Sequence, residues 1–528
     1  MPMNSTVQSA NRQIARAAGV VMAGMALSSL TGLFTTILVS RTFGTSAELD
    51  AFYAANRLTE ILFNLMAGGA LASAFIPTFT KFLTREDHQG AWRLASSIAN
   101  LLLLTLTLVA LVAGWAAPWL VRKVLAPGFE DPQQIQLTVS LLRVMLISCV
   151  VFGLSGLVMG VLNAQQHFAL PALAPASYRL GWILGIVLLV PRMGIYGLAW
   201  GVVIGAGLHF LVQLPALRGR GIQYKATLGL QSPAVREVGR LMAPRVLGVA
   251  VVQANFLVNT ILASGQPPGS LAALTLAFTL MIMPQTVIAQ AIAIAALPTF
   301  SAQAARGDLD DMRVSFATTL RGVLFLSLPA GLGLILLRQP IVSLLLERGA
   351  FQADSTELVA WALLWYAAGL VGHSLLEIIV RAFYAMHDTY TPVFVGAAAM
   401  TLNILFSLLF SEWFEQIGWA PHGGLALANS LATALECLLL LTLLRKRLKG
   451  LGLGQTQRGI WAILAGSACM AMGLLLWEGF SAGTSVWIRG GVGIALGASL
   501  YWGLALLFGA PEARQLPKLI LERFGRSH

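Results

Sequence analysis

The stretch Ala74-Phe75-Ile76-Pro77-Thr78-Phe79 decides the fold, because it returns about 221 residues later as Ala295-Ala296-Leu297-Pro298-Thr299-Phe300. A duplication this long, with an even number of spans in each copy, predicts two halves of the same orientation, related by an axis along the membrane normal. This build is typical of transporters that bind cargo between their halves, so the sequence indicates a transporter and not an enzyme. Further matched pairs support the repeat: Arg85/Arg306, Asp87/Asp308, Gly197-Leu198-Ala199/Gly424-Leu425-Ala426, Arg218/Arg445 and Arg220/Arg447.

The composition is that of a membrane protein. Of the 528 residues, 57% are hydrophobic and only 11% are charged, and the mean hydropathy is +0.77. A spanning helix needs roughly 20 mainly apolar residues. Runs of that length predict an all-α integral membrane protein with about fourteen transmembrane helices, at about 17–39, 51–76, 93–117, 135–160, 171–190, 194–217, 237–263, 271–297, 314–337, 356–380, 391–411, 423–444, 459–478 and 486–509.

The net charge of +12 does not indicate nucleic acid, because of where the charges lie. Lys and Arg concentrate in the connections that are cytoplasmic if the N-terminus is cytoplasmic, which is the positive-inside asymmetry. We therefore expect both termini in the cytoplasm and anionic membrane lipids against the basic runs. Cys149, Cys437 and Cys469 stand alone in apolar spans, so neither a disulfide, a metal site nor a cofactor is expected.

The expected domains follow the duplication. Residues 1–217 form an N-lobe of six spans, 218–235 a basic cytoplasmic linker and 236–445 a C-lobe of six spans. Residues 446–528 hold two appended spans and a tail, 516–524, whose mixed apolar and basic residues suit an amphipathic helix on the inner leaflet or a frayed terminus.

Buried cations supply the candidate binding residues. A charge inside a span costs at least about 2.5–3.5 kcal/mol, so it usually faces a cavity or a partner. Arg245 lies near the middle of its span after Pro244, which favours function; for Arg143, Arg179 and Arg321 the alternative is snorkelling or a bond to a backbone carbonyl. Guanidinium groups bind phosphate oxygens bidentately, so the surplus of arginine predicts an anionic cargo. The candidate substrate-binding residues are Arg57, Arg245, Arg179 and Arg143.

Acidic residues within the spans are fewer. Glu60 lies three residues after Arg57 and Glu377 four before Arg381, so each pair shares a helix face and is alternatively an intrahelical ion pair. Glu436 lies near the centre of its span without an obvious partner, and with Glu377 it is a candidate for ion coupling. His209 and His373 are expected to be interhelical hydrogen-bonding residues rather than proton carriers. Without a nucleotide-binding motif, energy must come from ion, potential or cargo gradients.

Several short motifs are spread along both lobes. They are Ser40-Arg41-Thr42-Phe43-Gly44 with Asp50-Ala51-Phe52-Tyr53, Ala126-Pro127-Gly128-Phe129, Gly160-Val161-Leu162-Asn163 with Pro171 and Pro175, Pro244-Arg245-Val246-Leu247-Gly248, and Arg381-Ala382-Phe383-Tyr384 with Asp388 and Thr391-Pro392. Together these motifs resemble those of the MurJ (MviN) lipid II flippases. The resemblance spans both lobes and implies the multidrug, oligosaccharidyl-lipid and polysaccharide exporter superfamily. It also implies that the cargo is undecaprenyl-pyrophosphate-linked peptidoglycan precursor, flipped from the inner to the outer leaflet, with its tail in a groove formed by the appended helices.

One departure bears on the cargo. The resemblance places family arginines at positions that are here Ser29, Thr35, Phe63 and Thr279, and an acidic partner at Ile282. A family lysine aligns with Arg57, which keeps one cation. Either Arg57, Arg245 and Arg179 bind the pyrophosphate here, or the cargo differs.

The sequence therefore predicts a lipid II flippase that works by alternating access, as a monomer in the cytoplasmic (inner) membrane of a bacterium. Asp50, at the external end of its span, is expected at the outer gate, and Glu60 and Arg381 are further gating candidates. The alternatives are a flippase for another undecaprenyl-pyrophosphate-linked oligosaccharide, of O-antigen or exopolysaccharide type, a cation-coupled drug exporter, and a pseudo-transporter that scaffolds envelope assembly.

Overall fold

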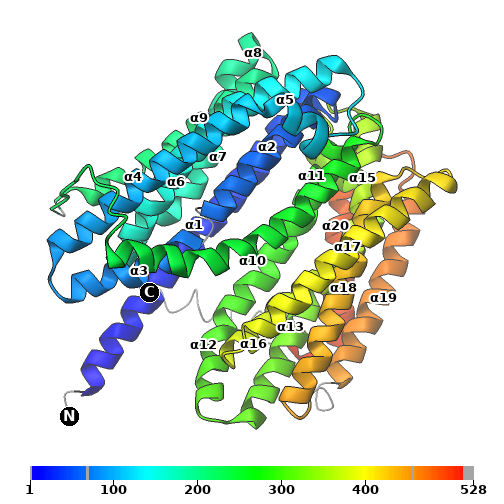
Figure 1. The fold of residues 1–528 in the computed structure, drawn as a ribbon. Coiled ribbons are helices and arrows are strands. Elements are labelled where there is room, and N and C mark those ends of the chain that lie inside the picture. The colour runs from blue at the N-terminus through cyan, green and yellow to red at the C-terminus, as the bar shows by residue number, and fades with distance from the viewer. Residues whose placement is uncertain (1–2, 67–69, 220, 453–456, 515–528) are drawn as a thin grey trace. The chain divides into compact units, whose positions relative to one another are not determined.

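The computed structural model describes residues 3–66, 70–219, 221–452 and 457–514, and every regular element in these ranges is a helix (Figure 1). The chain divides into two compact units between Ala272 and Ala273.

The first unit is built on six long helices and the shorter helices that join them. Its elements are α1 (Met3–Phe43), α2 (Ala47–Met66), α3 (Ala70–Thr84), α4 (His88–Trp115), α5 (Ala117–Leu120), η1 (Val121–Leu125), α6 (Pro132–Ala164), α7 (Ala169–Leu184), η2 (Gly185–Leu189), α8 (Val190–Met193), α9 (Ile195–Leu211), η3 (Leu214–Leu217) and α10 (Pro233–Ser264). The core is centred on the fully buried Leu49, Phe52 and Leu142, which α2 and α6 contribute.

The second unit begins within α11 (Ser270–Gln285). Its other elements are η4 (Thr286–Gln290), α12 (Ala291–Ala305), α13 (Leu309–Leu336), α14 (Arg338–Leu346), α15 (Ala353–Ala368), α16 (Leu370–Ala385), α17 (Tyr390–Gln416), α18 (His422–Arg447), α19 (Gln457–Phe480), η6 (Ile488–Val492) and α20 (Gly493–Leu507). A second core cluster, which includes Phe325, Ile463 and Tyr501, packs α19 and α20 onto α13.

Most of the expected spans appear as helices of the expected length. Twelve described helices are long and apolar enough to cross a membrane, and α15 with α16, bent by 43°, adds a thirteenth if the pair is one span. The remaining expected span, 51–76, coincides with α2 and half of α3. The helix α2 carries four charged side chains, and three of them lie within its last 18 residues and lower its hydropathy: Asp50, Arg57 and Glu60. The count of fourteen, and both termini in the cytoplasm, stay predictions.

The duplication is visible in matched local geometry. Asp87 begins α4 with φ −83° and ψ 72°, and its carboxylate accepts the Gly90 N–H at 2.7 Å. Asp308 begins α13 with φ −86° and ψ 76°, and accepts the Asp311 N–H at 3.2 Å. Both are side-chain N-caps. The same sequence signal therefore builds the same helix start in each unit.

Small residues bring α7 and α9 into close contact. A Cβ atom at Gly181 would lie 2.1 Å from the Gly205 Cα, and one at Gly185 would lie 2.5 Å from the Gly201 Cα. Each helix thus presents two glycines four residues apart, the spacing that lets membrane helices approach backbone to backbone.

The linker is bound along the start of α4. Asn100 Nδ2 donates to the carbonyls of Lys225 and Thr227 at 3.1 and 2.9 Å, and Tyr224 Oη donates to Asn100 Oδ1 at 2.7 Å. The Lys225 N–H donates to Ser96 Oγ at 3.1 Å. Polar side chains in the first half of α4 therefore form hydrogen bonds with the backbone of the linker, which is not paired in a sheet or helix.

The compact units and the expected lobes differ at one helix. The sequence assigned 236–445 to the C-lobe, whereas α10 lies in the first unit and packs on α2, α3 and α4. Lys81 on α3 and Glu237 on α10 form an ion pair at 2.6 Å that contributes to this packing. The lobe assignment, which rests on the duplication, stays a prediction. The tail at 516–524 lies outside the described residues.

Candidate functional site

Arg57 is held by groups from two helices. Its Nη1 pairs with Glu60 Oε2 at 2.8 Å, as expected for the intrahelical pair, and its Nε donates to Thr260 Oγ1 on α10 at 3.1 Å. The Phe256 ring lies against the guanidinium, with 5.5 Å from Cζ to the ring centroid. Phe256 and Thr260 are four residues apart and so lie on one face of α10. The Arg57 side chain is only 18% exposed, and its position is therefore fixed.

Arg179 lies among aromatic groups that pack on α2. The Arg179 Cζ is 5.8 Å from the Tyr178 ring centroid and 5.5 Å from that of Trp182, which indicates cation–π contact. The Phe52 ring on α2 lies 5.4 Å from that of Trp182 and 5.6 Å from that of Tyr53, one turn before Arg57. The structure thus brings Arg57, Glu60 and Arg179 into one region of the first unit.

The other two candidate arginines differ from this pair. Arg143 is exposed, and its Nε donates to the Gly114 carbonyl at 3.0 Å, which is the structural alternative considered from the sequence. Arg245 is also exposed on α10, and within the described residues its guanidinium makes no hydrogen bond or ion pair. One guanidinium N–H of Arg143 is thus bound to the backbone, whereas the guanidinium of Arg245 has no polar partner among the described residues.

Asp50 caps a turn through both of its carboxylate oxygens. Oδ2 accepts the Gly269 N–H at 2.6 Å and Oδ1 accepts the Ala272 N–H at 2.7 Å, and the residue is 3% exposed. Gly269 has φ +90°, and a Cβ there would lie 2.3 Å from the Thr45 carbonyl oxygen. The segments at 44–50 and 265–272, expected to be external, are thus tightly joined.

Two acidic candidates lie in the second unit. Glu377 and Arg381 form the expected intrahelical pair, with 3.3 Å between Oε2 and Nη2 and side chains 20% and 25% exposed. Glu436 is half-buried, makes no hydrogen bond or ion pair with a described residue, and lies 3.2 Å from where a Cβ at Gly396 would stand. Glycine at 396 therefore leaves room for the Glu436 carboxyl group.

Both candidate histidines bond between helices, as expected. His209 Nδ1 lies 2.7 Å from Ser155 Oγ, and His373 Nε2 lies 3.1 Å from Asn429 Oδ1.

Arg321 has a partner that the sequence analysis did not identify. It forms an ion pair with Glu512, beyond α20, and the two side chains are only 11% and 8% exposed. From the sequence, the structural interpretation of Arg321 was snorkelling or a hydrogen bond to a backbone carbonyl. The partner lies 191 residues away and outside every expected span, so no local spacing could reveal it.

Asp388, one of the motif residues, lies in the turn between α16 and α17. Burial alone would raise the pKa of its carboxyl group, but hydrogen bonds from the Thr391 side chain and N–H, at 2.6 and 3.0 Å, and the Arg447 charge at 2.6 Å lower that pKa below its usual range. The carboxylate is therefore ionised at neutral pH and ties the turn to the end of α18.

At the positions where the resemblance places family arginines, the uncharged side chains present here have local partners. The hydroxyls of Ser29, Thr35 and Thr279 donate to the carbonyls four residues earlier, at 2.7 to 3.0 Å. Phe63 packs on Phe152, with ring centroids 4.4 Å apart. These positions therefore contribute no buried cation.

An apolar cavity of about 380 Å³ lies between the last two helices and α13. Its walls include Leu334 from α13, Leu337 directly after that helix, Leu474 from α19, and Gly497 and Tyr501 from α20. Its volume falls in the range of small-molecule pockets, roughly 300–1,000 Å³. A cavity so apolar suits a hydrocarbon chain.

Comparison with known proteins gives consistent matches along nearly the whole chain. A family model described as lipid II flippase MurJ matches residues 39–493. The lipid II flippase MurJ of Burkholderia cenocepacia is 32% identical over 460 residues, which is 85% of this chain and 87% of that protein. The probable lipid II flippase MurJ of Vibrio cholerae is 30% identical over 519 residues, 93% of this chain and 95% of that protein.

The fold also matches solved structures. A lipid II flippase MurJ in an inward closed conformation superposes with a TM-score of 0.79 at 23% identity, covering 94% of this chain and 99% of that one. An inward-facing MATE family multidrug resistance transporter of the MOP superfamily gives a TM-score of 0.66 at 15% identity, covering 81% and 98%. At these identities the likeness is one of fold.

Proposed function

Because the chain belongs to the lipid II flippase MurJ family, we propose that it flips lipid II, the lipid-linked peptidoglycan precursor, from the inner to the outer leaflet of a bacterial cytoplasmic membrane. The observation that carries the proposal is the family match over residues 39–493. The membrane helices and the half-buried, oriented Arg57 support it. The chain then acts as a transporter in cell-wall synthesis.

Arg57, Arg179 and Arg245 are the proposed binding residues for the pyrophosphate. Arg57 keeps Nη2 free of hydrogen bonds to described residues, while Nε and Nη1 are bound to Thr260 and Glu60. Because the Glu60 side chain is 42% exposed, it can yield Nη1 to a phosphate oxygen. Guanidinium groups in such partly desolvated places bind phosphate strongly. Arg143 is left out of this set because it is bound to the Gly114 carbonyl.

Asp50 is the proposed outer gate. Its two hydrogen bonds to Gly269 and Ala272 hold the external segments together, and alternating access requires them to break when the external side opens. Glu60 and Arg381 are further gating proposals, since each is in an ion pair that a bound phosphate or a helix movement would rearrange. Glu436 and Glu377 remain the proposed groups for ion coupling, and a monomer the proposed functional state.

A second candidate is a flippase for another undecaprenyl-pyrophosphate-linked oligosaccharide, such as an O-antigen or exopolysaccharide unit. The observation in its favour is that Ser29, Thr35, Phe63 and Thr279 contribute no charge. The binding set would then serve the pyrophosphate that both cargoes share, and the sugar would decide between them.

The test is depletion of the resident flippase in a peptidoglycan-making host that carries this gene. Wild-type protein and Arg143→Ala should sustain growth, whereas Arg57→Ala/Arg245→Ala together should not. Growth supported fully by the double variant would refute the binding set. Native mass spectrometry of the purified protein then identifies the lipid-linked glycan that co-purifies, and an O-antigen-type glycan in place of lipid II would establish the second candidate.

A further inference from the structure

A polar cavity of about 510 Å³ lies in the second unit where three distant segments meet. In a chain with only 11% charged residues, such a gathering of polar groups is unusual. The segments are the start of α14, the first two turns of α15 and the start of α18, all at ends predicted to be external. They contribute Arg338, Gln339, Asp354, Glu357, Trp361 and His422.

The apolar cavity lies on the other side of the same helix junction. Leu337 and Ile341 line the apolar cavity, whereas Arg338 and Gln339, between them in the sequence, line the polar one. The junction of α13 and α14 therefore separates an apolar space from a polar space, an arrangement that suits a ligand with a hydrocarbon tail and a polar head.

Two walls of the polar cavity are fixed by backbone hydrogen bonds. Trp361 Nε1 donates to the Ala420 carbonyl at 3.0 Å, and its ring lies 5.4 Å from that of Trp419. His422 Nε2 lies 3.0 Å from the Leu358 carbonyl and donates to it. The indole and imidazole are thus oriented in advance, which lowers the entropic cost of binding.

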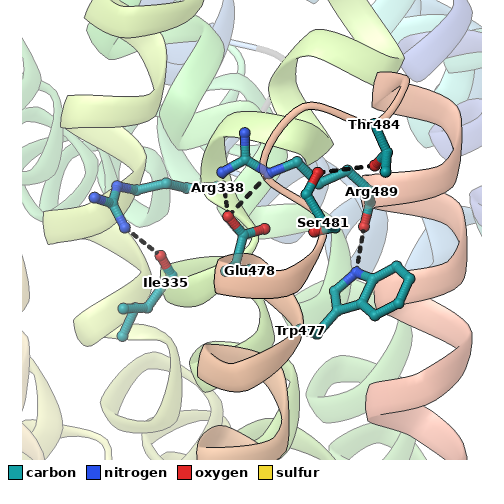
Figure 2. Close-up of polar contacts among 7 residues, drawn as sticks. All are labelled: Ile335, Arg338, Trp477, Glu478, Ser481, Thr484 and Arg489. Atoms are coloured by element: carbon teal, nitrogen blue, oxygen red, sulfur yellow. Dashed lines mark hydrogen bonds and ion pairs between the residues drawn. The ribbon is translucent and has the colours of Figure 1, made fainter.

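The charges of the cavity are unpaired. Arg338 Nη1 donates to the Ile335 carbonyl at 2.8 Å, and the other guanidinium N–H groups make no hydrogen bond with described residues. Figure 2 shows these contacts: Arg338 donates to the Ile335 carbonyl, whereas the Glu478 carboxylate accepts from Arg489. Asp354 and Glu357 are exposed and, within the described ranges, form neither ion pair nor hydrogen bond. A cation and two anions therefore line one cavity without neutralising one another.

Resting on the proposed function, we propose that this cavity binds the zwitterionic peptide part of the cargo headgroup on the external face. A peptide carboxylate pairs with Arg338, and a peptide ammonium pairs with Asp354 and Glu357. Arg338 lies on α14 and the two acids lie on α15, so only a ligand that carries both charges satisfies all three together. Trp361 supplies an aromatic face for the adjoining aliphatic or sugar group.

The test uses the full-length protein in nanodiscs and a water-soluble muropeptide with a free amine and a free carboxylate, without pyrophosphate or lipid. Its binding is measured by saturation-transfer NMR. We expect Arg338→Gln to weaken binding about tenfold or more, from the loss of a charge-assisted hydrogen bond. Asp354→Asn/Glu357→Gln should weaken it by a similar factor, and Arg338→Lys by less.

Matched controls remove one charge of the same sign outside the polar cavity. Arg348→Gln removes an arginine that lies over Trp487, 5.4 Å from its ring centroid, and Glu412→Gln removes an exposed acid bonded to Gln416; both should bind normally. A peptide acetylated at its amine and amidated at its carboxylate should lose binding, and so should the disaccharide alone. Equal binding by Arg338→Gln, by the blocked peptide or by the disaccharide would overturn the proposal.

The same variants are assayed for growth after flippase depletion, which separates this proposal from the proposed function. If wild-type protein sustains growth but binds no muropeptide, the polar cavity proposal fails and the flippase function stands. If wild-type protein sustains no growth and co-purifies with no lipid-linked glycan, the flippase function fails. Thermal unfolding of each variant identifies any loss of binding that arises from misfolding, and Arg338→Lys then provides the folded comparison.

Discussion

Substituting Asp50 by Asn tests the proposed outer gate directly. In the wild type both carboxylate oxygens accept backbone N–H groups, from Gly269 at 2.6 Å and from Ala272 at 2.7 Å. Asparagine fills the same space but has one acceptor oxygen, and its NH₂ group must face the second N–H. One of the two hydrogen bonds is therefore lost, and the other becomes neutral.

The size of the effect follows from this count. A hydrogen bond to a charged group contributes about 1.5–3 kcal/mol, and each 1.4 kcal/mol changes an equilibrium tenfold. Asp50 is 3% exposed, so water does not replace the lost acceptor. We expect local opening at residues 265–272 to become roughly 10- to 100-fold more frequent.

Hydrogen–deuterium exchange with mass spectrometry measures this opening in peptides that cover 265–272. Asp131→Asn is the control, because Asp131 also accepts a backbone N–H, that of Gln133 at 2.9 Å, but at the start of α6 and away from residues 265–272. The control should speed exchange at the start of α6 and leave 265–272 unchanged. Unchanged exchange at 265–272 in Asp50→Asn, in protein that remains folded, would refute the gate.

Three further predictions concern stability, measured by thermal or denaturant unfolding in detergent. Gly181→Ala should lower the unfolding free energy by about 1–3 kcal/mol, since its Cβ would lie 2.1 Å from the Gly205 Cα; Gly207→Ala, with nothing within 4 Å, should have little effect, and equal losses would contradict the packing argument. Arg321→Gln should cost about 3–5 kcal/mol because it leaves Glu512 buried and unpaired, whereas Arg321→Met/Glu512→Leu should recover most of that loss. Asp388→Asn should destabilise the protein at pH 7, and its difference from wild type should shrink below about pH 4. The folded state lowers the pKa of Asp388, so the ionised carboxylate stabilises the fold at pH values above its unfolded pKa of about 3.9. This stabilisation is lost as the pH falls through the folded pKa. A difference in stability that does not depend on pH would contradict the reasoning.

The sequence predicted the features that depend on local pattern. Apolar runs located the helices, because a bilayer requires a continuous apolar stretch and satisfied backbone. The repeat predicted matched helix starts, and Asp87 and Asp308 have nearly the same torsion angles because an N-cap is set by the residue and its next three neighbours. The pairs Arg57–Glu60 and Glu377–Arg381 followed from helical spacing alone.

Contacts between distant segments were not predictable in this way. Nothing in the spacing of α10 indicates that Thr260 and Phe256 hold Arg57, because the register of α2 against α10 depends on packing. The same holds for Arg321 with Glu512, and for the polar cavity around Arg338, a residue that the sequence analysis did not single out. Amphipathic pattern also gives no guide where both helix faces are apolar, as in most of these spans.

The hydrogen bonds between the linker and α4 limit how far the start of α10, the seventh expected span, can move. Asn100 donates to the Thr227 carbonyl, and α10 begins at Pro233. Only residues 228–232 therefore connect this hydrogen bond to the helix. Five residues stretch to at most roughly 17 Å. Any movement that carries the start of α10 beyond that distance must first break the hydrogen bond between Asn100 and the Thr227 carbonyl, and a larger movement must also break those of Lys225 and Tyr224.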